Sequence, residues 1–360
     1  MKGKVVGLVV AIVAVAVAVG VRLTWQAPDP HEMAHRKEAE AINKIDQIET
    51  LPLEDQLERL QAMLEPTQPP EVRVAALEAI ADLRPPNLLT ILENALRDYH
   101  SAVRVRAGEL AHKLPKEQAL RFLLNLTDDH DKDVRLAGLQ KLSLLRDKNA
   151  VPTLIGLLND PNLETVQMAM SALRSITGKD YYARYTDPEP ERQRAVAQWQ
   201  AWWRTERTKF PQTPAATPYQ PEISVPAEKV TLRLLDGTQV SLHRPEKPLL
   251  INFWGTWCAG CVAELPALKQ LHEKYGERIL MVGIAYDEPE GEQGLKRFCE
   301  KQGIRYPQML ANRDVERAFP IHGVPQTVLI DTKGRIRYWW EGARDYHTFA
   351  RALERLLRNP

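Results

Sequence analysis

Two cysteines separated by two residues, Cys258 and Cys261, are the part of the sequence best suited to chemistry. Such a CxxC pair either cycles between a dithiol and an internal disulfide or binds zinc. At the start of a helix, unpaired N–H groups and the helix dipole lower the pKa of the first thiol, so Cys258 would attack and Cys261, one turn further, would resolve. A structural zinc site needs a second pair of cysteines or histidines, and no such pair is suitably placed in the sequence. We therefore expect redox chemistry at a Cys258–Cys261 disulfide, with no metal or other cofactor.

The residues around the pair predict the elements that position it. Residues 249–254 (LLINFW) form an apolar run typical of a buried strand, and this strand leads directly into a helix that the CxxC opens. From residue 229 to residue 360, β-branched runs alternate with helical stretches, which indicates an α/β domain. Cys299 lies within a helical run and is expected to be a buried small apolar residue rather than a third redox thiol.

Length and charge limit the possible classes of protein. At 360 residues the chain is long enough for two or three domains. It has 48 Lys and Arg against 47 Asp and Glu, a net charge of +1, and 44% of its residues are hydrophobic. This balance disfavours both a basic nucleic-acid binder and an acidic disordered chain, so we expect no nucleic-acid partner. Three cysteines are too few for a disulfide-stapled secreted scaffold.

The N-terminus reads as a membrane segment. Lys2 and Lys4 precede an uncharged apolar run of 17 residues, 5–21, which would cover about 26 Å of a hydrocarbon core about 30 Å thick. We favour a membrane anchor, one transmembrane helix, over residues 1–25; the alternative is a signal peptide cleaved near residues 16–18. Both interpretations place the rest of the chain outside the cytoplasm, on the periplasmic face.

A motif recurs at intervals of 31, 31 and 32 residues in the first half of the chain. Each copy has a valine followed by arginine or glutamine, and positions four and eleven residues later repeat one face of a helix. An aspartate recurs just before these helices, where it can cap the helix that follows. The valines are Val72, Val103, Val134 and Val166, and the aspartates are Asp98, Asp129 and Asp160.

A second apolar segment precedes each of the last three motif helices, at residues 88–96, 119–126 and 151–158, so the repeating unit is a helical hairpin. The pattern resembles the HEAT-like repeats, and the resemblance implies an all-α solenoid over residues 30–210. Such solenoids commonly present a surface to another protein, although a spacer that holds the second domain off the membrane is an alternative.

A helix over residues 191–210 carries Trp199, Trp202 and Trp203. Aromatic residues at this spacing share one helix face, which is suited to cover the apolar end of a solenoid. We favour this capping role over a ligand-binding role.

Residues 211–228 contain five prolines and little that a core would bury. This composition predicts a semi-extended linker, and therefore two domains with some freedom between them.

A zinc-protease string, HExxH, occurs at His31, Glu32 and His35. It follows the expected anchor with no preceding domain to form a cleft and no third ligand at a recognised spacing. We interpret it as the first turn of a solvated helix.

From about residue 230 to residue 357 the chain resembles the thioredoxin superfamily, and within it the membrane-tethered thiol-disulfide oxidoreductases of the TlpA/ResA type. The resemblance depends on Trp257 before the first cysteine, on Pro266 five residues after the second, and on residues 323–327 (GVPQT) leading a strand. It implies that Val324–Pro325 is a cis peptide that faces the cysteines, and that this loop and Trp257 bind the backbone of an extended substrate segment. Residues 331–334 then read as a hairpin turn.

One position distinguishes the subfamily. Cytosolic thioredoxins carry a buried aspartate six residues before the first cysteine, where this chain has Asn252, which cannot titrate. Glu264, three residues after Cys261 and on the same helix face, matches a carboxylate of the TlpA/ResA type and is our candidate base for Cys261. An exposed helix glutamate is the alternative.

The chain also departs from the family. Ala259 and Gly260 stand between the cysteines where a proline usually precedes the second, and redox potential depends on this dipeptide, so the direction of electron flow stays open. Gln326 replaces the usual threonine after the cis proline. A peroxiredoxin is disfavoured, because it would need a threonine three residues before the cysteine, whereas Thr256 lies two before it.

We therefore expect a multidomain protein: one transmembrane helix, an all-α HEAT-like solenoid and an α/β thioredoxin-like fold. The resemblance implies a reductase of protein disulfides that a membrane redox partner recharges. Apocytochrome c, in cytochrome c maturation, would be a typical client. The alternatives are a disulfide oxidase or isomerase, and a HEAT-repeat scaffold whose redox activity is secondary.

Overall fold

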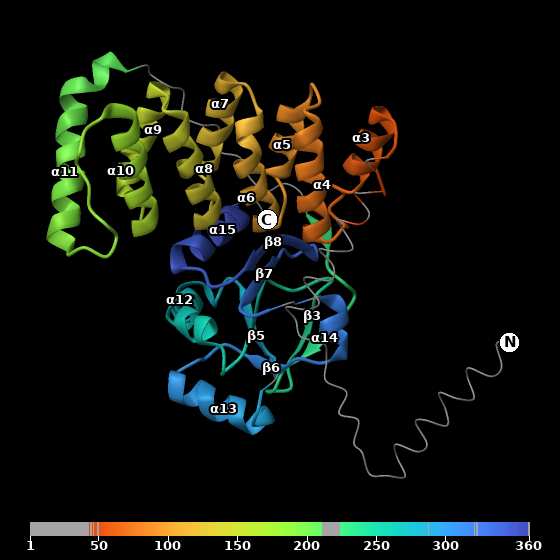
Figure 1. Cartoon of the computed structure of the whole chain (residues 1–360). Coiled ribbons are helices and arrows are strands. Elements are labelled where there is room, and N and C mark those ends of the chain that lie inside the picture. The colour runs from red at the N-terminus through yellow and green to blue at the C-terminus, as the bar shows by residue number, and fades with distance from the viewer. Residues whose placement is uncertain are drawn as a thin grey trace, which may run out of the picture.

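The computed structural model describes residues 43, 45, 47, 48, 50–210, 224–286, 288–319, 321 and 323–358. A row of helices, α3 to α11, lies above an α/β part that contains the main sheet (Figure 1). The two expected fold types are therefore both present. The anchor expected at residues 1–25 lies outside the described residues, within which no helix is long and apolar enough to cross a membrane.

The helices of the first part form stacked hairpins, as the repeat predicts. Each recurring valine is buried on the second helix of its unit, and these second helices pack against one another from unit to unit. Their first helices, α5, α7 and α9, fall on the three predicted segments. The helices are α3 (Leu53–Ala62), α4 (Pro70–Leu83), α5 (Leu88–Ala95), α6 (Ser101–Glu109), α7 (Lys116–Leu126), α8 (Lys132–Leu145), α9 (Val151–Gly156), α10 (Leu163–Thr177) and α11 (Glu189–Glu206), with short 3-10 turns η1 (Leu110–Lys113), η2 (Lys148–Ala150), η3 (Leu157–Asn159) and η4 (Arg207–Lys209).

The recurring aspartates do not cap the helices, so that expectation was wrong. Each aspartate pairs with the motif arginine 25 residues earlier and accepts the backbone N–H two residues further on. The N-caps of α8 and α10 are instead Asp131 and Asn162. Because a buried charge is costly without its partner, these pairs link each hairpin to the next. The ion pairs are Arg73–Asp98 at 2.8 Å, Arg104–Asp129 at 3.0 Å and Arg135–Asp160 at 3.5 Å.

Helix α11 covers the end of the solenoid. Trp199 is completely buried and its indole N–H donates to the carbonyl oxygen of Tyr181. Trp202 and Trp203 are half-buried and pack with Phe210. The tryptophan face therefore packs inward, as its spacing predicts.

The second part is built on a six-stranded sheet in the order β1-β8-β7-β4-β5-β6. The central strand β4 is parallel to β5 and antiparallel to β7, and β7 and β8 form a hairpin. A separate two-stranded sheet, β2 and β3, packs into the core on one face. The elements are β1 (Val225–Pro226), β2 (Thr231–Arg233), β3 (Gln239–Ser241), β4 (Leu249–Trp254), α12 (Ala259–Tyr275), β5 (Leu280–Ala285), α13 (Gly291–Gln302), β6 (Gln308–Leu310), α14 (Arg313–Ala318), β7 (Gln326–Ile330), β8 (Arg335–Glu341) and α15 (Tyr346–Arg358).

Strand β4 is buried along its whole length, and its side chains alternate between the two faces of the sheet. Leu249, Ile251 and Phe253 enter the core shared with α14 and the β2–β3 hairpin. Leu250 enters the core shared with α12 and α15. Asn252 follows the same alternation, so its amide points toward α12.

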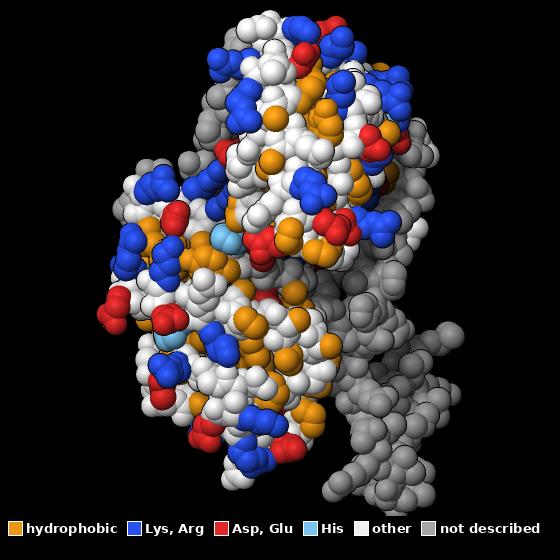
Figure 2. All heavy atoms as spheres, turned by 90° about the vertical axis from the view of Figure 1, so that its left-hand side faces the viewer, with side chains coloured by type: hydrophobic (Ala, Val, Ile, Leu, Met, Phe, Trp, Pro, Cys, Tyr) orange, Lys and Arg blue, Asp and Glu red, His pale blue; other side chains and the backbone are white. Residues whose placement is uncertain are grey.

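The two parts of the molecule pack directly against each other. Strand β1 pairs only with the start of β8. Further along β8, the solenoid takes its place: the backbone N–H of Trp339 donates to the carbonyl oxygen of Tyr99, just before α6. His130, which precedes α8, is completely buried with its ring 4.5 Å from that of Tyr338. Figure 2 shows the two lobes in contact, with basic and acidic side chains interspersed on the face in view. The solenoid thus covers an edge that β8 would otherwise expose.

Charge complementarity supports this contact. Arginines of α15 and of the loop before it meet aspartates at the turns of the solenoid. Asn162 also donates to Asp345 at 2.8 Å. The ion pairs are Arg344–Asp131 at 3.1 Å, Arg344–Asp133 at 3.0 Å, Arg351–Asp160 at 3.1 Å and Arg355–Asp128 at 3.2 Å.

Two expectations about the connection between the two domains need correction. Residues 225–226 form strand β1, so the C-terminal part begins before the expected boundary at residue 229. The freedom expected between the two domains is also absent from the described residues, because backbone hydrogen bonds and buried ion pairs connect the two parts. The composition of a connecting segment says nothing about surfaces that meet elsewhere. Residues 211–223 of the expected linker lie outside the described residues.

Candidate active site

Strand β4 and helix α12 position the two cysteines. Cys258 is the N-cap of α12, and its Sγ accepts the backbone N–H of Cys261 at 3.1 Å. The sulfurs are bonded to each other, with an S–S distance of 2.16 Å. Both cysteines are buried within an apolar cluster that includes Trp254 and Leu265. An N–H that points at Sγ from the first turn of a helix would stabilise a thiolate at Cys258 after reduction.

The loop before β7 faces the disulfide. The Val324–Pro325 peptide is cis, and Sγ of Cys258 lies 3.5 Å from the carbonyl oxygen of Val324. Pro325 also approaches the cysteine dipeptide, since a Cβ added at Gly260 would lie 3.6 Å from its Cδ. The structure therefore brings Cys258, Cys261, Val324 and Pro325 together.

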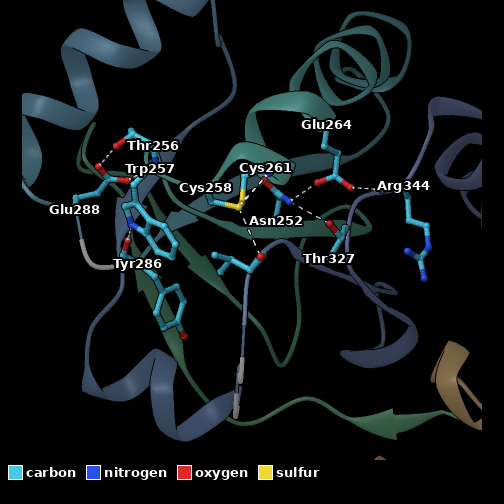
Figure 3. Close-up of a disulfide and its surroundings, with 11 residues drawn as sticks. Asn252, Thr256, Trp257, Cys258, Cys261, Glu264, Tyr286, Glu288, Thr327 and Arg344 are labelled. Carbon is cyan, nitrogen blue, oxygen red and sulfur yellow. Dashed lines mark hydrogen bonds between the residues drawn. A yellow bond between two sulfur atoms is a disulfide. The ribbon is translucent and has the colours of Figure 1, made fainter. Parts of the chain in front are cut away.

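Trp257 lies on the open side of the site. Its side chain is 55% exposed, and its indole N–H donates to the carbonyl oxygen of Tyr286 at 3.1 Å. The preceding residue, Thr256, donates from both its backbone and its hydroxyl to the carboxylate of Glu288. These contacts hold the turn before the disulfide and leave the indole ring available to a partner (Figure 3).

Glu264 lies on the closed side of the site and is 3% exposed. One carboxylate oxygen accepts from Asn252 at 3.1 Å and the other accepts from the backbone N–H of Arg344 at 2.7 Å. Burial raises the pKa of Glu264 to about 7, against the opposing effects of Arg344 and Asn252. A carboxylate with this pKa, one turn from Cys261, can accept and return a proton near neutral pH.

Two polar residues in the hydrogen-bond network of Asn252 and Glu264 were missed as site residues from the sequence. Thr327 accepts from Asn252 at 3.1 Å and lies opposite it in the β4–β7 register. Its place directly after Val324, Pro325 and Gln326 is a signal that could have identified it. Arg344 carries no such signal, because nothing in its local sequence places it beside Glu264.

The remaining sequence candidates lie at or beyond the edge of the site. Cys299 is buried and unpaired on α13, as predicted, and burial, with Glu288 and Glu300, raises its pKa to about 11. Gln326 is buried and accepts from the indole N–H of Trp339 at 2.8 Å, so it supports the sheet. The HExxH string lies outside the described residues, among which no group of three or more His, Cys, Asp or Glu could hold a metal ion.

Two family models match parts of the chain. Residues 223–339 match the AhpC/TSA family, and residues 57–143 and 120–199 match HEAT repeats. The thioredoxin-like protein YneN of Bacillus subtilis is 27% identical over 113 residues, which is 31% of this chain and 66% of that protein. The thiol-disulfide oxidoreductase ResA of Geobacillus kaustophilus is 31% identical over 112 residues, which is 30% of this chain and 62% of that protein. The chain thus spans less than two thirds of the length of these two relatives.

A solved structure is also similar. It is a thiol:disulfide interchange protein of the thioredoxin family from Chlorobium tepidum, 30% identical to this chain, with a TM-score of 0.34. The match covers 38% of this chain and 97% of that one.

The fold and the site give the C-terminal part a thioredoxin-like domain that is similar to thiol-disulfide oxidoreductases. The chain combines this domain, with its ResA-like relatives, with an N-terminal array of HEAT repeats. The resemblance to ResA-like thioredoxin proteins and to HEAT repeats, stated from the sequence, is confirmed.

Proposed function

We propose that this protein is a membrane-tethered, extracytoplasmic reductase of protein disulfides. One observation carries the proposal: a Cys258–Cys261 disulfide at the start of α12 lies between a cis-proline loop and a buried glutamate. The tether rests on the apolar run at residues 5–21. The direction of electron flow rests on the resemblance to ResA-like proteins.

The proposed reaction transfers two electrons from the dithiol to a client. The thiolate of Cys258 attacks one sulfur of the client disulfide, forms a mixed disulfide and releases the other client sulfur as a thiolate. Glu264 takes the proton of Cys261, whose thiolate then attacks Sγ of Cys258. The mixed disulfide breaks, the second client thiolate leaves, and the Cys258–Cys261 disulfide forms. The structure corresponds to this oxidised state, which a membrane redox partner would reduce again.

The HEAT repeats would serve as the client-interaction module in this proposal. One edge of the solenoid already holds the thioredoxin-like domain, so a client would bind other surfaces of the array. An extracytoplasmic CxxC protein such as apocytochrome c is the kind of client that this chemistry suits.

A trapping experiment tests the proposed chemistry. Replacing the resolving cysteine (Cys261→Ser) should accumulate a mixed disulfide between Cys258 and a disulfide-containing peptide, because the second attack cannot occur. Cys258→Ser should abolish both the adduct and turnover, whereas the control Cys299→Ser should turn over like the wild type. Turnover that persists in Cys258→Ser would overturn the proposal.

Equilibration with glutathione tests the direction. A reductase should have a reduction potential near the value of thioredoxin, about −270 mV, whereas a value near about −120 mV would indicate an oxidase.

A further inference from the structure

The three residues that follow β8 connect the solenoid to the reacting groups. The backbone N–H of Gly342 donates to the carbonyl oxygen of Pro325 at 2.9 Å, and the backbone N–H of Arg344 donates to Glu264 at 2.7 Å. Gly342 has a φ of 78°, a conformation that favours glycine. This short segment therefore bonds both to the cis-proline loop and to the candidate base.

The side chain of Arg344 extends away from Glu264 to the solenoid. Its Nε lies 3.1 Å from Asp131 and a terminal nitrogen lies 3.0 Å from Asp133, both at the start of α8 in the solenoid. Arg344 is 8% exposed and Asp131 is completely buried. Although burial opposes it, Arg344 and Arg104 hold the pKa of Asp131 below its ordinary value, so this carboxylate stays ionised. Figure 3 shows Arg344 with its backbone toward Glu264 and its guanidinium directed away from it.

We propose that the HEAT array positions the proton acceptor of the dithiol reaction: Asp131 and Asp133 hold Arg344, whose backbone N–H orients Glu264 to take the proton of Cys261. This inference rests on the proposed function and extends it, because it makes the solenoid part of the redox site. Arg344 and the two aspartates are positioning residues, since none of them touches the sulfurs.

The groups around Glu264 determine whether its pKa should rise or fall when Arg344 is displaced. Asn252 and the Arg344 N–H favour the ionised carboxylate, and the Arg344 guanidinium adds a nearby positive charge. Tyr306, on the segment before β6, is also close enough to interact electrostatically with Glu264, and burial raises its pKa, so it stays neutral. Loss of the Arg344 N–H would therefore raise the pKa of Glu264.

The main test is the double variant Asp131→Ser, Asp133→Ser, in which the serine at position 131 can still cap α8 but is too short to hold the guanidinium. The titration midpoint of Glu264, measured from its carboxyl 13C shift in the reduced protein, should rise by about 1 pH unit. Removing two negative charges would by itself lower the midpoint, so a rise identifies the displacement of Arg344, whose N–H and guanidinium both favour the ionised carboxylate. If the double variant does not fold, Asp131→Ser alone leaves Asp133 on Arg344 and should give a smaller rise.

Two further variants sharpen the test. Arg344→Met should also raise the midpoint, and adding the two serines to it should give no further rise, because the connection is already broken. The matched control is Asp128→Ser, which removes the Arg355 ion pair from the same interface without a path to Glu264, and it should leave the midpoint unchanged.

The outcomes separate this inference from the proposed function. A midpoint that stays constant or falls in the double variant overturns the positioning role, even when turnover is normal. A wild-type protein that fails to reduce any disulfide peptide overturns the proposed function, while the titration of Glu264 still reports on the positioning.

Discussion

At the scale of single residues, Glu264 combines burial with one hydrogen bond to each of its carboxylate oxygens. The sequence identified it through its spacing from Cys261, but its burial is a property of the folded domain. Asn252, which replaces the aspartate of cytosolic thioredoxins, donates to Glu264 rather than titrating itself. Among the described residues, the ionisable side chain that bonds to this amide is therefore Glu264, which lies on helix α12 and not on strand β4.

The raised pKa of Glu264 predicts a specific pH dependence of stability. The folded state favours the protonated carboxyl, so this contribution is complete below the unfolded pKa near 4.5 and is lost as pH rises through about 7. The loss should amount to about 3 kcal/mol. Denaturant unfolding of the oxidised protein at a series of pH values should show this loss in the wild type but not in Glu264→Gln. Parallel curves for the two proteins would contradict the assignment.

At the scale of elements, the repeat spacing predicted the helical hairpins but not how closely they approach. A Cβ added at Gly138 on α8 would lie 2.8 Å from Cβ of Leu126 and 3.3 Å from the carbonyl oxygen of Leu123, both on α7. The sequence aligned this glycine with Ala76 and Ala107 in other repeats. Only the packing of α7 against α8 shows that no side chain fits there.

Two glycine substitutions test this close approach. Gly138→Ala should lower the free energy of unfolding by about 1 to 2 kcal/mol, because the overpacking exceeds the gain in helix propensity. Gly156→Ala should instead stabilise the protein by up to about 1 kcal/mol, since Gly156 is helical and exposed, with no atom within 4 Å of an added Cβ. Thermal or denaturant unfolding measures both. A stabilising Gly138→Ala would show that the two helices can move apart.

At the scale of the whole molecule, the contact between the solenoid and the thioredoxin-like domain contains a buried histidine, His130. His130 is completely buried, accepts from Arg104 at 3.1 Å and lies against Tyr338 and Trp340. Burial, together with nearby arginines, holds the pKa of His130 well below its ordinary value of 6.5. The docked protein therefore favours the neutral imidazole, even though Asp129 lies 3.2 Å from Nδ1 of the ring.

This preference predicts weaker docking in acid. Because the pKa of His130 is depressed on folding, its contribution is complete above about pH 6.5 and is lost as pH falls below that value. The melting temperature of the full chain should fall between pH 7 and pH 5, and His130→Phe, which keeps a flat ring against Tyr338, should reduce the fall. As pH falls, protonation of His130 should destabilise the protein, whereas protonation of Glu264 should stabilise it. The effect of His130 should therefore be measured in a Glu264→Gln background. An unchanged slope in His130→Phe on that background would refute the prediction.

The sequence by itself determined the features that depend on local spacing. The CxxC pair after an apolar run, the GVPQT segment and the 31-residue repeat each lie within a short stretch, so their chemistry and their fold types could be read directly. Only the tertiary structure decided which of these parts act together. Asp131 and Arg344 are 213 residues apart, and their pairing depends on how the turns of one fold match the arginines of another. No periodicity along the chain contains that information, because the contact arises from two surfaces that form only after each part has folded.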